Sequence, residues 1–193
     1  MKKADRRTQR TSAKLRQALV ELILEEGYES ISIRDITERA HVGYATFFRH
    51  YEGKEALLAD AFNQSIDELK QLLFSLGETK PEVEGRIIFE HIKEHKTLYQ
   101  VFLHGEATLS LLEEVKRGAV KELVMRYARY TSTIPTGILA NHVVSSVMAL
   151  IKWWLHNDMP FEPEQMGKFY AELIMKPVRQ LFRNWPLPSE EAS

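Results

Sequence analysis

Apolar residues recur at every third or fourth position along nearly the whole of this sequence, and this helical period limits the possible folds more than any other feature. No stretch alternates apolar and polar residues for long, and no Asn-Gly or Asp-Gly pair marks a β-hairpin. We therefore predict an all-α fold. The expected helices cover residues 11–26, 32–41, 44–51, 53–76, 82–94, 96–103, 106–131, 135–157 and 162–183.

Length and composition fit an ordinary globular chain. With 193 residues, 44% of them hydrophobic, the sequence can build one sizeable domain or two small ones around a real core. It has no cysteine, which excludes disulfides, thiolate zinc sites and cysteine nucleophiles. The apolar segment 137–155 contains Asn141, His142 and Lys152, so we expect a buried helix rather than a membrane span. We expect a cytoplasmic protein with no membrane partner.

Basic residues gather at the N-terminal end of a chain whose net charge is only −1. The first 20 residues contain seven Lys and Arg against one acidic residue, Asp5. Such an asymmetry suggests that this end of the chain meets an anionic partner. A solvated basic tail explains the same charges without any partner.

Two short helices separated by about three residues are predicted within SIRDITERAHVGYATFFRHYEGKEALL, residues 32–58. Ser32 is a good N-cap, and Asp35 follows three residues later, as in a capping box. Helices joined in this way are typical of a helix-turn-helix, whose second helix enters the major groove of DNA. Small residues at Gly43 and Ala45 would let the backbone approach DNA closely. By spacing alone, a helical hairpin inside an ordinary core explains the pattern equally well.

The run RDITERAHVGYATFFRHYEGKEALL resembles, without a gap, the usual run RDIAERAGVSKGTLYRHFPSKEALL of the TetR family of bacterial transcriptional regulators. The resemblance is specific over residues 10–60, and beyond residue 65 it depends only on the number and length of the helices. It implies that the N-terminal end of the second short helix reads bases while flanking residues hold phosphates. The implied DNA-binding residues are Ser32, Arg34, Gly43, Tyr44, Ala45, Thr46, Phe48, His50 and Lys54.

The sequence departs from the family pattern at three of its positions. His41 replaces the usual Gly of the turn, which implies strain if the backbone there needs a positive φ. Phe48 replaces the usual Tyr, so that one phosphate-directed hydroxyl is missing. Tyr44 replaces a common Lys, which exchanges a charge for an aromatic ring able to contact a thymine methyl group.

The predicted helices divide into a small N-terminal unit and a larger C-terminal one. We expect a three-helix DNA-binding domain over residues 1–55, followed by a connecting helix over about 53–76. A helical domain for ligand binding and dimerisation is expected over residues 77–185, before a frayed tail at 186–193.

The last two predicted helices carry the most continuous apolar surface of the chain. A helix that is apolar on most faces must be buried on most faces. Packing inside one chain explains about half of this surface, and a four-helix bundle between two protomers explains all of it. The family resemblance favours such a homodimer, and we expect its interface to include Val144, Met148, Ile151, Phe169, Leu173, Val178 and Leu181.

The helices between residues 82 and 131 mix aromatic and apolar residues with a few polar ones. A mostly apolar cavity with a few polar groups is typical of a small-molecule pocket, although buried aromatics belong more often to a simple core. The resemblance implies an inducer in this domain, and the sequence does not identify it. The candidate lining residues are Phe89, Ile92, Tyr99, Phe102, Met125 and His142.

The segment HIKEH, from His91 to His95, matches the H-x-x-E-H pattern of one zinc peptidase group. Histidines four positions apart share a helix face, but the sequence offers no recognisable further ligand. A solvated helix face explains the segment better, and we predict no metal site and no cofactor. No G-x-S-x-G, P-loop or G-x-G-x-x-G pattern occurs, so an enzyme has no support from the sequence.

These observations predict a ligand-responsive transcriptional regulator, a repressor by family resemblance, that binds a palindromic operator in double-stranded DNA as a homodimer. The alternative is a TetR-like protein whose head or C-terminal domain docks a protein partner rather than DNA. His41 and the hydroxyl missing at Phe48 favour this alternative to a modest degree.

Overall fold

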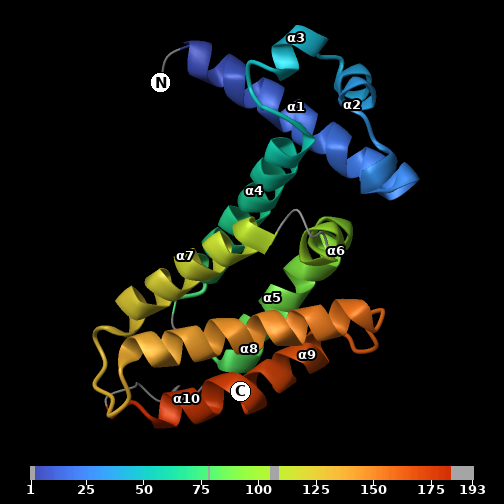
Figure 1. Cartoon of the computed structure of the whole chain (residues 1–193). Helices are drawn as coiled ribbons and strands as arrows, with labels where there is room; N and C mark the ends of the chain where they lie inside the picture. Colours follow the sequence, from blue (N-terminus) through green and yellow to red (C-terminus); the bar gives the residue numbers. More distant parts are fainter. Residues whose placement is uncertain (1–2, 78, 105–108, 184–193) are drawn as a thin grey trace. The chain divides into compact units, whose positions relative to one another are not determined.

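The computed structural model describes residues 3–77, 79–104 and 109–183, and these ranges consist of helices and their connections (Figure 1). The all-α prediction is confirmed. In the described part Ser132 and Phe182 form an isolated β-bridge, and no strand occurs there. The elements are α1 (Lys3–Glu26), the 3-10 turn η1 (Tyr28–Ser30), α2 (Ile33–Ala40), α3 (Tyr44–Phe47), α4 (Lys54–Ser75), α5 (Pro81–Glu94), α6 (Lys96–His104), α7 (Leu109–Tyr127), α8 (Thr136–His156), α9 (Pro163–Tyr170), a π-helical turn (Ala171–Met175) and α10 (Lys176–Gln180).

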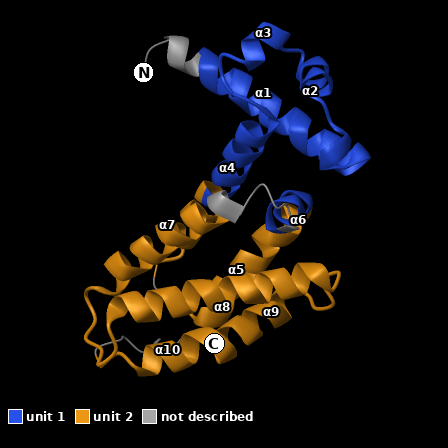
Figure 2. Ribbon diagram, in the orientation of Figure 1, with its two compact units in different colours: residues 1–66, 97–109 blue, residues 67–96, 110–193 orange. Residues whose placement is uncertain are grey.

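The chain divides into two compact units (Figure 2). Unit 1 holds residues 1–66 and 97–109, and unit 2 holds residues 67–96 and 110–193. Helix α4 therefore begins in unit 1 and ends in unit 2. The expected boundaries differ from these units chiefly at α6, which we expected in the C-terminal domain and which belongs mostly to unit 1. The expected tail at 186–193 lies outside the described residues.

The core of unit 1 forms where the apolar faces of α1, α2, α3 and α4 meet. Its largest fully buried side chains lie at the helical spacings seen in the sequence, and each of them exposes at most 1% of its surface: Leu15, Leu19, Ile36, Phe47, Leu57 and Leu58. Burying a side chain of this size stabilises a fold by about 1.5–3 kcal/mol relative to leaving it in water. The short helices α2 and α3 are held by this burial rather than by their own length.

Aromatic rings join α6 to α4 within unit 1. The Phe62 and Phe102 rings are stacked with centroids 3.6 Å apart, and the Tyr99 ring meets Phe62 edge-on at 5.1 Å. All three side chains are buried. Tyr99 and Phe102, which we proposed as pocket residues, are thus part of a packed aromatic cluster.

In unit 2, α5 and α9 cross at two glycines. A Cβ atom added at Gly167 would lie 2.5 Å from the carbonyl oxygen of Glu82, and one added at Gly85 would lie 2.9 Å from the Cα of Gly167. No other residue type fits at this separation without moving the helices apart. The close approach lets neighbouring large side chains bury themselves, and Met166 and Tyr170 of α9 expose 0% and 3% of their surface.

A buried carboxylate joins α5 to α7 and α10. Glu84 lies 3.3 Å from the Arg126 guanidinium and 3.8 Å from that of Arg179, and its side chain is 9% exposed. The nearby Tyr127 is buried, and burial together with the Glu84 charge raises the pKa of its phenol to about 12. Because a buried charge is costly unless it is paired, the two guanidinium groups make this carboxylate tolerable in the core.

The ends of two helices in unit 1 differ from the sequence prediction. Helix α1 begins at Lys3 rather than near residue 11, because Lys and Arg are good helix formers and no Gly or Pro interrupts the segment. Helix α3 ends at Phe47 rather than near residue 51, because the amides of Arg49 and His50 bond to carbonyls three residues back. This tightened turn closes α3 after about one turn.

The last predicted helix, 162–183, is interrupted in the structure. The N–H of Lys176 donates to the carbonyl oxygen of Ala171, five residues earlier, as in a π-helix. Pro177 follows and has no N–H to offer to the preceding turn, so that the regular hydrogen-bond ladder cannot run through this point. The helix is therefore divided into α9, the π-turn and α10.

Helix α8 is long and apolar enough to cross a membrane by length and composition alone, and 33% of its apolar window is buried inside the unit. We expected this helix to be buried on most faces, and the structure buries only one. Val143 and Trp154 lie on the buried side, while Ile138 and Trp153 expose 61% and 47% of their surface. Among the described residues, the other face of α8 is largely exposed.

Candidate nucleic-acid interface

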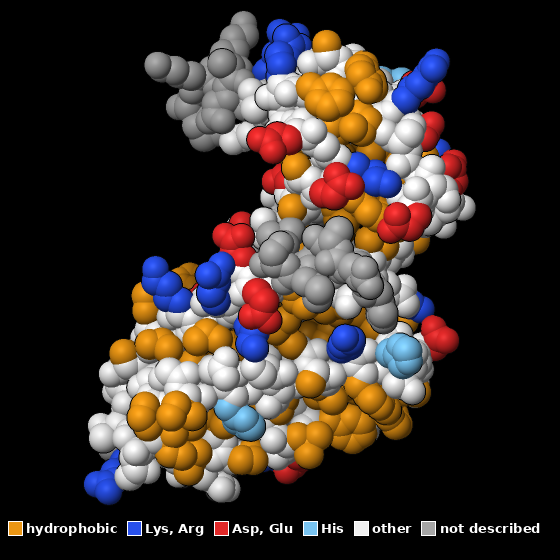
Figure 3. Space-filling model, viewed as in Figure 1, with side chains coloured by type: hydrophobic (Ala, Val, Ile, Leu, Met, Phe, Trp, Pro, Cys, Tyr) orange, Lys and Arg blue, Asp and Glu red, His pale blue; other side chains and the backbone are white. Residues whose placement is uncertain are grey.

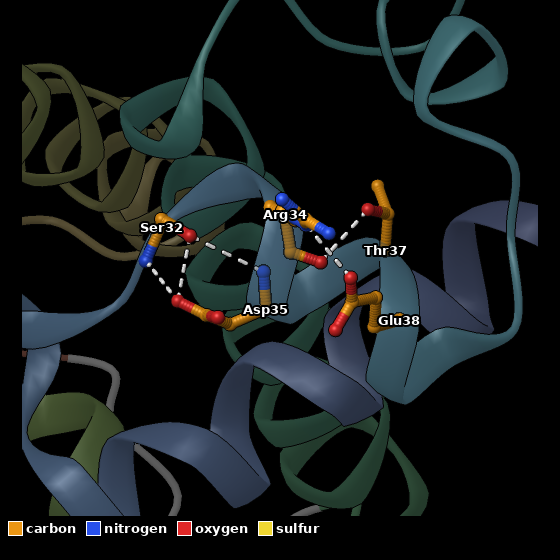
Figure 4. Close-up of polar contacts among 5 residues, drawn as sticks. All are labelled: Ser32, Arg34, Asp35, Thr37 and Glu38. Carbon is orange, nitrogen blue, oxygen red and sulfur yellow. Dashed lines mark hydrogen bonds and ion pairs between the residues drawn. The ribbon is translucent and has the colours of Figure 1, made fainter.

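A capping box starts α2. The Ser32 hydroxyl accepts the Asp35 amide at 3.3 Å, and the Ser32 amide donates to the Asp35 carboxylate at 2.8 Å (Figure 4). The Ser32 hydroxyl also donates to this carboxylate at 2.6 Å, and these bonds lower the pKa of Asp35. A carboxylate that stays charged at a helix N-terminus stabilises the helix dipole. The direction of α2 is thus fixed by the residues that the sequence pattern singled out.

The turn after α2 needs a left-handed residue. His41 has φ 52° and ψ 45°, and its amide donates to the carbonyls at the end of α2. The Val42 amide then bonds to Thr37 O at 3.0 Å, and Gly43 is extended as the residue before α3. The backbone at His41 thus has the positive φ on which the implied strain depended. A non-glycine residue holds the geometry that joins the two short helices.

Helix α3 has one buried anchor and an exposed aromatic face. Phe47 is fully buried, whereas Tyr44 and Phe48 expose 56% and 47% of their surface. The Phe48 ring meets the Tyr44 ring edge-on at 5.2 Å and the Phe47 ring at 5.3 Å. Ala45 is exposed and Thr46 half-buried between them. The structure thus brings the proposed base readers together on one surface.

The side chains proposed to hold phosphates already have partners within the head. Arg34 lies on the surface and donates to Glu38 at 2.8 Å (Figure 4). The His50 Nδ1 lies 3.2 Å from the Ser12 hydroxyl of α1. Lys54 donates to the carbonyls of Tyr28 and Ile31, each at 3.0 Å, and lies over the Tyr28 ring. Lys54 and His50 therefore also hold the head together.

Sequence reasoning missed Arg49. Its guanidinium is exposed and donates to the Thr46 hydroxyl at 2.7 Å, which holds the charge beside the exposed face of α3. The signal in the sequence was the spacing of three residues between Thr46 and Arg49, which places both on the same side of a helical turn. Arg49 belongs to the candidate interface with the residues proposed from the sequence.

An open hollow of about 690 Å³ lies between α1, the end of α3 and α4. Arg16 of α1 and Tyr51 both donate to the Asp60 carboxylate of α4, at 2.7 and 2.5 Å. Burial, followed by this bond to Asp60, raises the pKa of Tyr51. These hydrogen bonds join α1 and the segment that follows α3 to α4.

The proposed pocket residues of unit 2 differ in their exposure. Phe89 and Ile92 are buried in unit 2, where the Phe89 ring meets the Trp154 ring at 5.1 Å. Met125 exposes 62% of its surface and His142 is exposed as well, because α7 and α8 turn these positions away from the core. Their role in ligand binding stays a prediction.

The proposed dimer residues fall into two groups. Val144 and Val178 expose 7% and 2% of their surface, so they belong to the core of unit 2 and offer no free interface. The others remain accessible on α8 and on the α9 to α10 segment, where Leu173 and Leu181 are exposed and Met148, Ile151 and Phe169 are half-buried.

The two histidines of the HIKEH segment lie side by side on α5. Their ring centroids are 4.4 Å apart, His91 is buried, and His95 lies 3.8 Å from the Glu68 carboxylate. Within the residues described, no three His, Asp or Glu side chains come together as a group that could hold a metal ion.

Family comparisons cover both parts of the chain. Residues 15–61 match the family described as bacterial regulatory proteins, tetR family, and residues 86–176 match a transcriptional regulator C-terminal region. An uncharacterised HTH-type transcriptional regulator of Bacillus subtilis, YxbF, is 38% identical over 171 residues, which cover 84% of this chain and 44% of YxbF. The chain thus spans less than half the length of that relative.

Solved structures share this fold. A TetR-family regulator from Syntrophomonas wolfei superposes with a TM-score of 0.73 at 17% identity, over 88% of this chain and 95% of that one. FadR from Bacillus subtilis, solved in complex with stearoyl-CoA, gives a TM-score of 0.61 at 15% identity, over 84% and 96% of the two chains.

Proposed function

Because this chain belongs to the TetR family of transcriptional regulators, we propose that it binds DNA and acts as a homodimeric repressor of a palindromic operator. In this proposal α3 enters the major groove, and a small molecule that binds the C-terminal region releases the DNA. The whole of the activity, including operator, effector and direction of control, is part of the proposal.

The observation that carries the proposal is the geometry of the head. Helix α3 is fixed from behind by the buried Phe47 and by the left-handed turn at His41, and it projects an accessible face. A major groove about 12 Å wide admits one α-helix. A helix of four residues with an accessible face within the described part of unit 1 suits that groove, as in the helix-turn-helix geometry.

The apolar surface of unit 2 supports the dimer. Hydrophobic side chains gather over α8 in the space-filling view (Figure 3). Ile138 and Leu173 expose 61% and 66% of their surface. Contiguous exposed apolar surface marks sites of protein–protein contact. Two heads related by a two-fold axis would match half-sites one helical turn apart, about 34–36 Å.

Release by an effector is a shift of population. A ligand that binds the DNA-incompetent form more tightly weakens DNA binding by the same factor by which DNA weakens ligand binding. Long-chain acyl-CoA is a reasonable first compound to test, because FadR of the same fold was solved with stearoyl-CoA.

The rival proposal is a head that docks a protein. Lys54 and His50 have structural partners, so fewer side chains are fully free to bind phosphate than the sequence suggested. Salt separates the two proposals, because binding to duplex DNA releases counterions and weakens steeply as salt rises.

The test is selection of duplexes from a random pool, followed by fluorescence anisotropy at low and physiological salt. We expect a palindromic, salt-sensitive site.

Tyr44→Ala should cost about 1–3 kcal/mol at one base position, and Arg34→Gln should weaken binding to all sequences alike. Arg34 is a cleaner probe than Lys54, which also binds carbonyl oxygens. Leu24→Ala is the control, since this exposed side chain lies at the far end of α1. Failure to enrich any duplex would refute the proposal.

A further inference from the structure

The exposed surface of α3 carries rings where polar readers of bases are usual. Tyr44 and Phe48 expose 56% and 47% of their surface, and Ala45 beside them is exposed as well. Hydrophobic side chains are visible over this end of unit 1 (Figure 3). Water penalises exposed apolar area, so a cluster of this kind needs a partner with an apolar group of its own.

The rings are held in place before any partner arrives. Phe48 meets the buried Phe47 ring at 5.3 Å on one side and the Tyr44 ring at 5.2 Å on the other. A chain of edge-to-face contacts thus runs from the core of the head to its surface. Side chains that are already ordered lose little conformational entropy when they bind.

The charged groups nearby leave the middle of this surface apolar. Arg49 is held by the Thr46 hydroxyl at 2.7 Å, and Arg34 is held by Glu38 at 2.8 Å. The bidentate arginine contact to guanine, which is the commonest specific contact in the major groove, therefore requires these groups to leave their present partners.

Among the base edges of the major groove, only thymine presents a methyl group. We infer that Tyr44 and Phe48 recognise the 5-methyl group of a thymine in each operator half-site. This inference rests on the proposed function, because it takes α3 as the helix that enters the groove. Ala45 and Gly43 leave the backbone free to approach until the rings touch the methyl.

The test changes one methyl group and nothing else in the DNA. Thymines of the selected operator are replaced one at a time by deoxyuridine, which keeps every hydrogen-bonding group and lacks only the methyl. Burial of one methyl is worth about fourfold in affinity, so the wild type should lose about fourfold at one position of a half-site and roughly fifteenfold when both half-sites are changed.

The protein variants assign the effect to residues. Tyr44→Ala and Phe48→Ala should bind the thymine and deoxyuridine operators with nearly equal affinity. Tyr44→Phe should keep the full methyl dependence, because it removes the hydroxyl and retains the ring. Leu24→Ala, an exposed apolar change outside α2 and α3, should behave as the wild type.

Each outcome decides the inference. If the wild type binds an operator without any thymine methyl as tightly as the normal one, the inference is overturned while the proposed DNA-binding function stands. It is also overturned if the methyl dependence persists in both alanine variants. If no duplex binds at all, the proposed function itself fails, and the inference fails with it.

Discussion

The crossing of α5 and α9 gives the sharpest quantitative prediction, because its geometry depends on the absence of one side chain. A Cβ at Gly167 would lie 2.5 Å from Glu82 O and 2.7 Å from the Arg86 amide nitrogen, and both atoms belong to helix backbone. Neither can rotate out of the way. Ordinary contact begins at 3.4 Å, so Gly167→Ala must separate the helices by about 0.9 Å (3.4 − 2.5 Å).

The loss of dispersion contacts determines how strongly Gly167→Ala destabilises the fold. On the order of 40 atom contacts across the crossing, at 0.1–0.2 kcal/mol each, amount to about 4–8 kcal/mol, and a gap of this width forfeits a quarter to a half of each contact. The overpacking cost is then about 1–4 kcal/mol, in line with other small-to-large changes in cores. Alanine regains about 1 kcal/mol of helix propensity, which leaves a net loss of about 1.5 kcal/mol.

Gly118→Ala is the matched control. Gly118 also lies inside a helix, α7, but a Cβ there meets no atom within 4 Å. Gly118→Ala should gain the helix propensity of alanine without a steric clash. The difference in the free energy of unfolding between the two variants therefore measures the overpacking cost alone. Thermal unfolding followed by circular dichroism, at one fixed protein concentration, should lower the Tm of Gly167→Ala by about 3–6 °C and raise that of Gly118→Ala by about 2–4 °C. A Gly167→Ala protein as stable as Gly118→Ala would refute the reasoning.

Three further predictions concern single side chains. Ser32→Ala removes the capping box and should lower the Tm by about 2–4 °C. The lowered pKa of Asp35 adds to the free energy of unfolding only above the unfolded pKa of this carboxyl. The variant should therefore lose less stability on acidification than the wild type. His41→Gly should raise the Tm by about 1–3 °C, since relief of a left-handed histidine slightly exceeds the entropy cost of glycine; a lower Tm would contradict the strain argument. The pKa of Tyr127 is raised to about 12, so folding favours its neutral phenol. The contribution of this phenol to the free energy of unfolding is fully present below its unfolded pKa of about 10 and is lost as the pH rises toward 12. Urea unfolding across this range should show a smaller alkaline loss in Tyr127→Phe, and an unchanged loss would exclude Tyr127 as its source.

The head was the part best predicted from sequence, for a physical reason. Its turn depends on local chemistry, namely the cap at Ser32, the left-handed residue at His41 and the buried ring of Phe47. The cap and the turn act within a few residues, so the order of residues contains that information, and the apolar helical period indicates that Phe47 is buried. The end of α3 was predicted four residues too late, because the turn that closes this helix is held by backbone hydrogen bonds that no residue type in the sequence indicates.

The C-terminal part was predicted less well because its exposure depends on contacts between distant segments. An apolar stripe shows that a helix is buried somewhere, but not which of its positions a neighbouring helix covers. Val144 was expected at a dimer surface and is covered within the chain, whereas Met125 was expected inside and is exposed. The π-turn before Pro177 likewise rotates the following positions relative to a regular helix.

For Arg49 and Lys54 the sequence predicts the charge but not the hydrogen-bond partners. In the structure Arg49 donates to the Thr46 hydroxyl, and Lys54 donates to two carbonyl oxygens. Whether a positive charge is available to DNA depends on these partners as much as on its position in the helix-turn-helix.

Lys54 also has a consequence for how sequences of this family should be compared. Its ammonium binds the carbonyls of Tyr28 and Ile31, in the connection between α1 and α2, while its position at the start of α4 puts it beside the candidate interface. Under the proposed function, this side chain has two roles, one in holding the head together and one in binding the operator. Substitutions at position 54 among relatives should therefore covary with the length and sequence of the α1–α2 connection, even where the operators are the same.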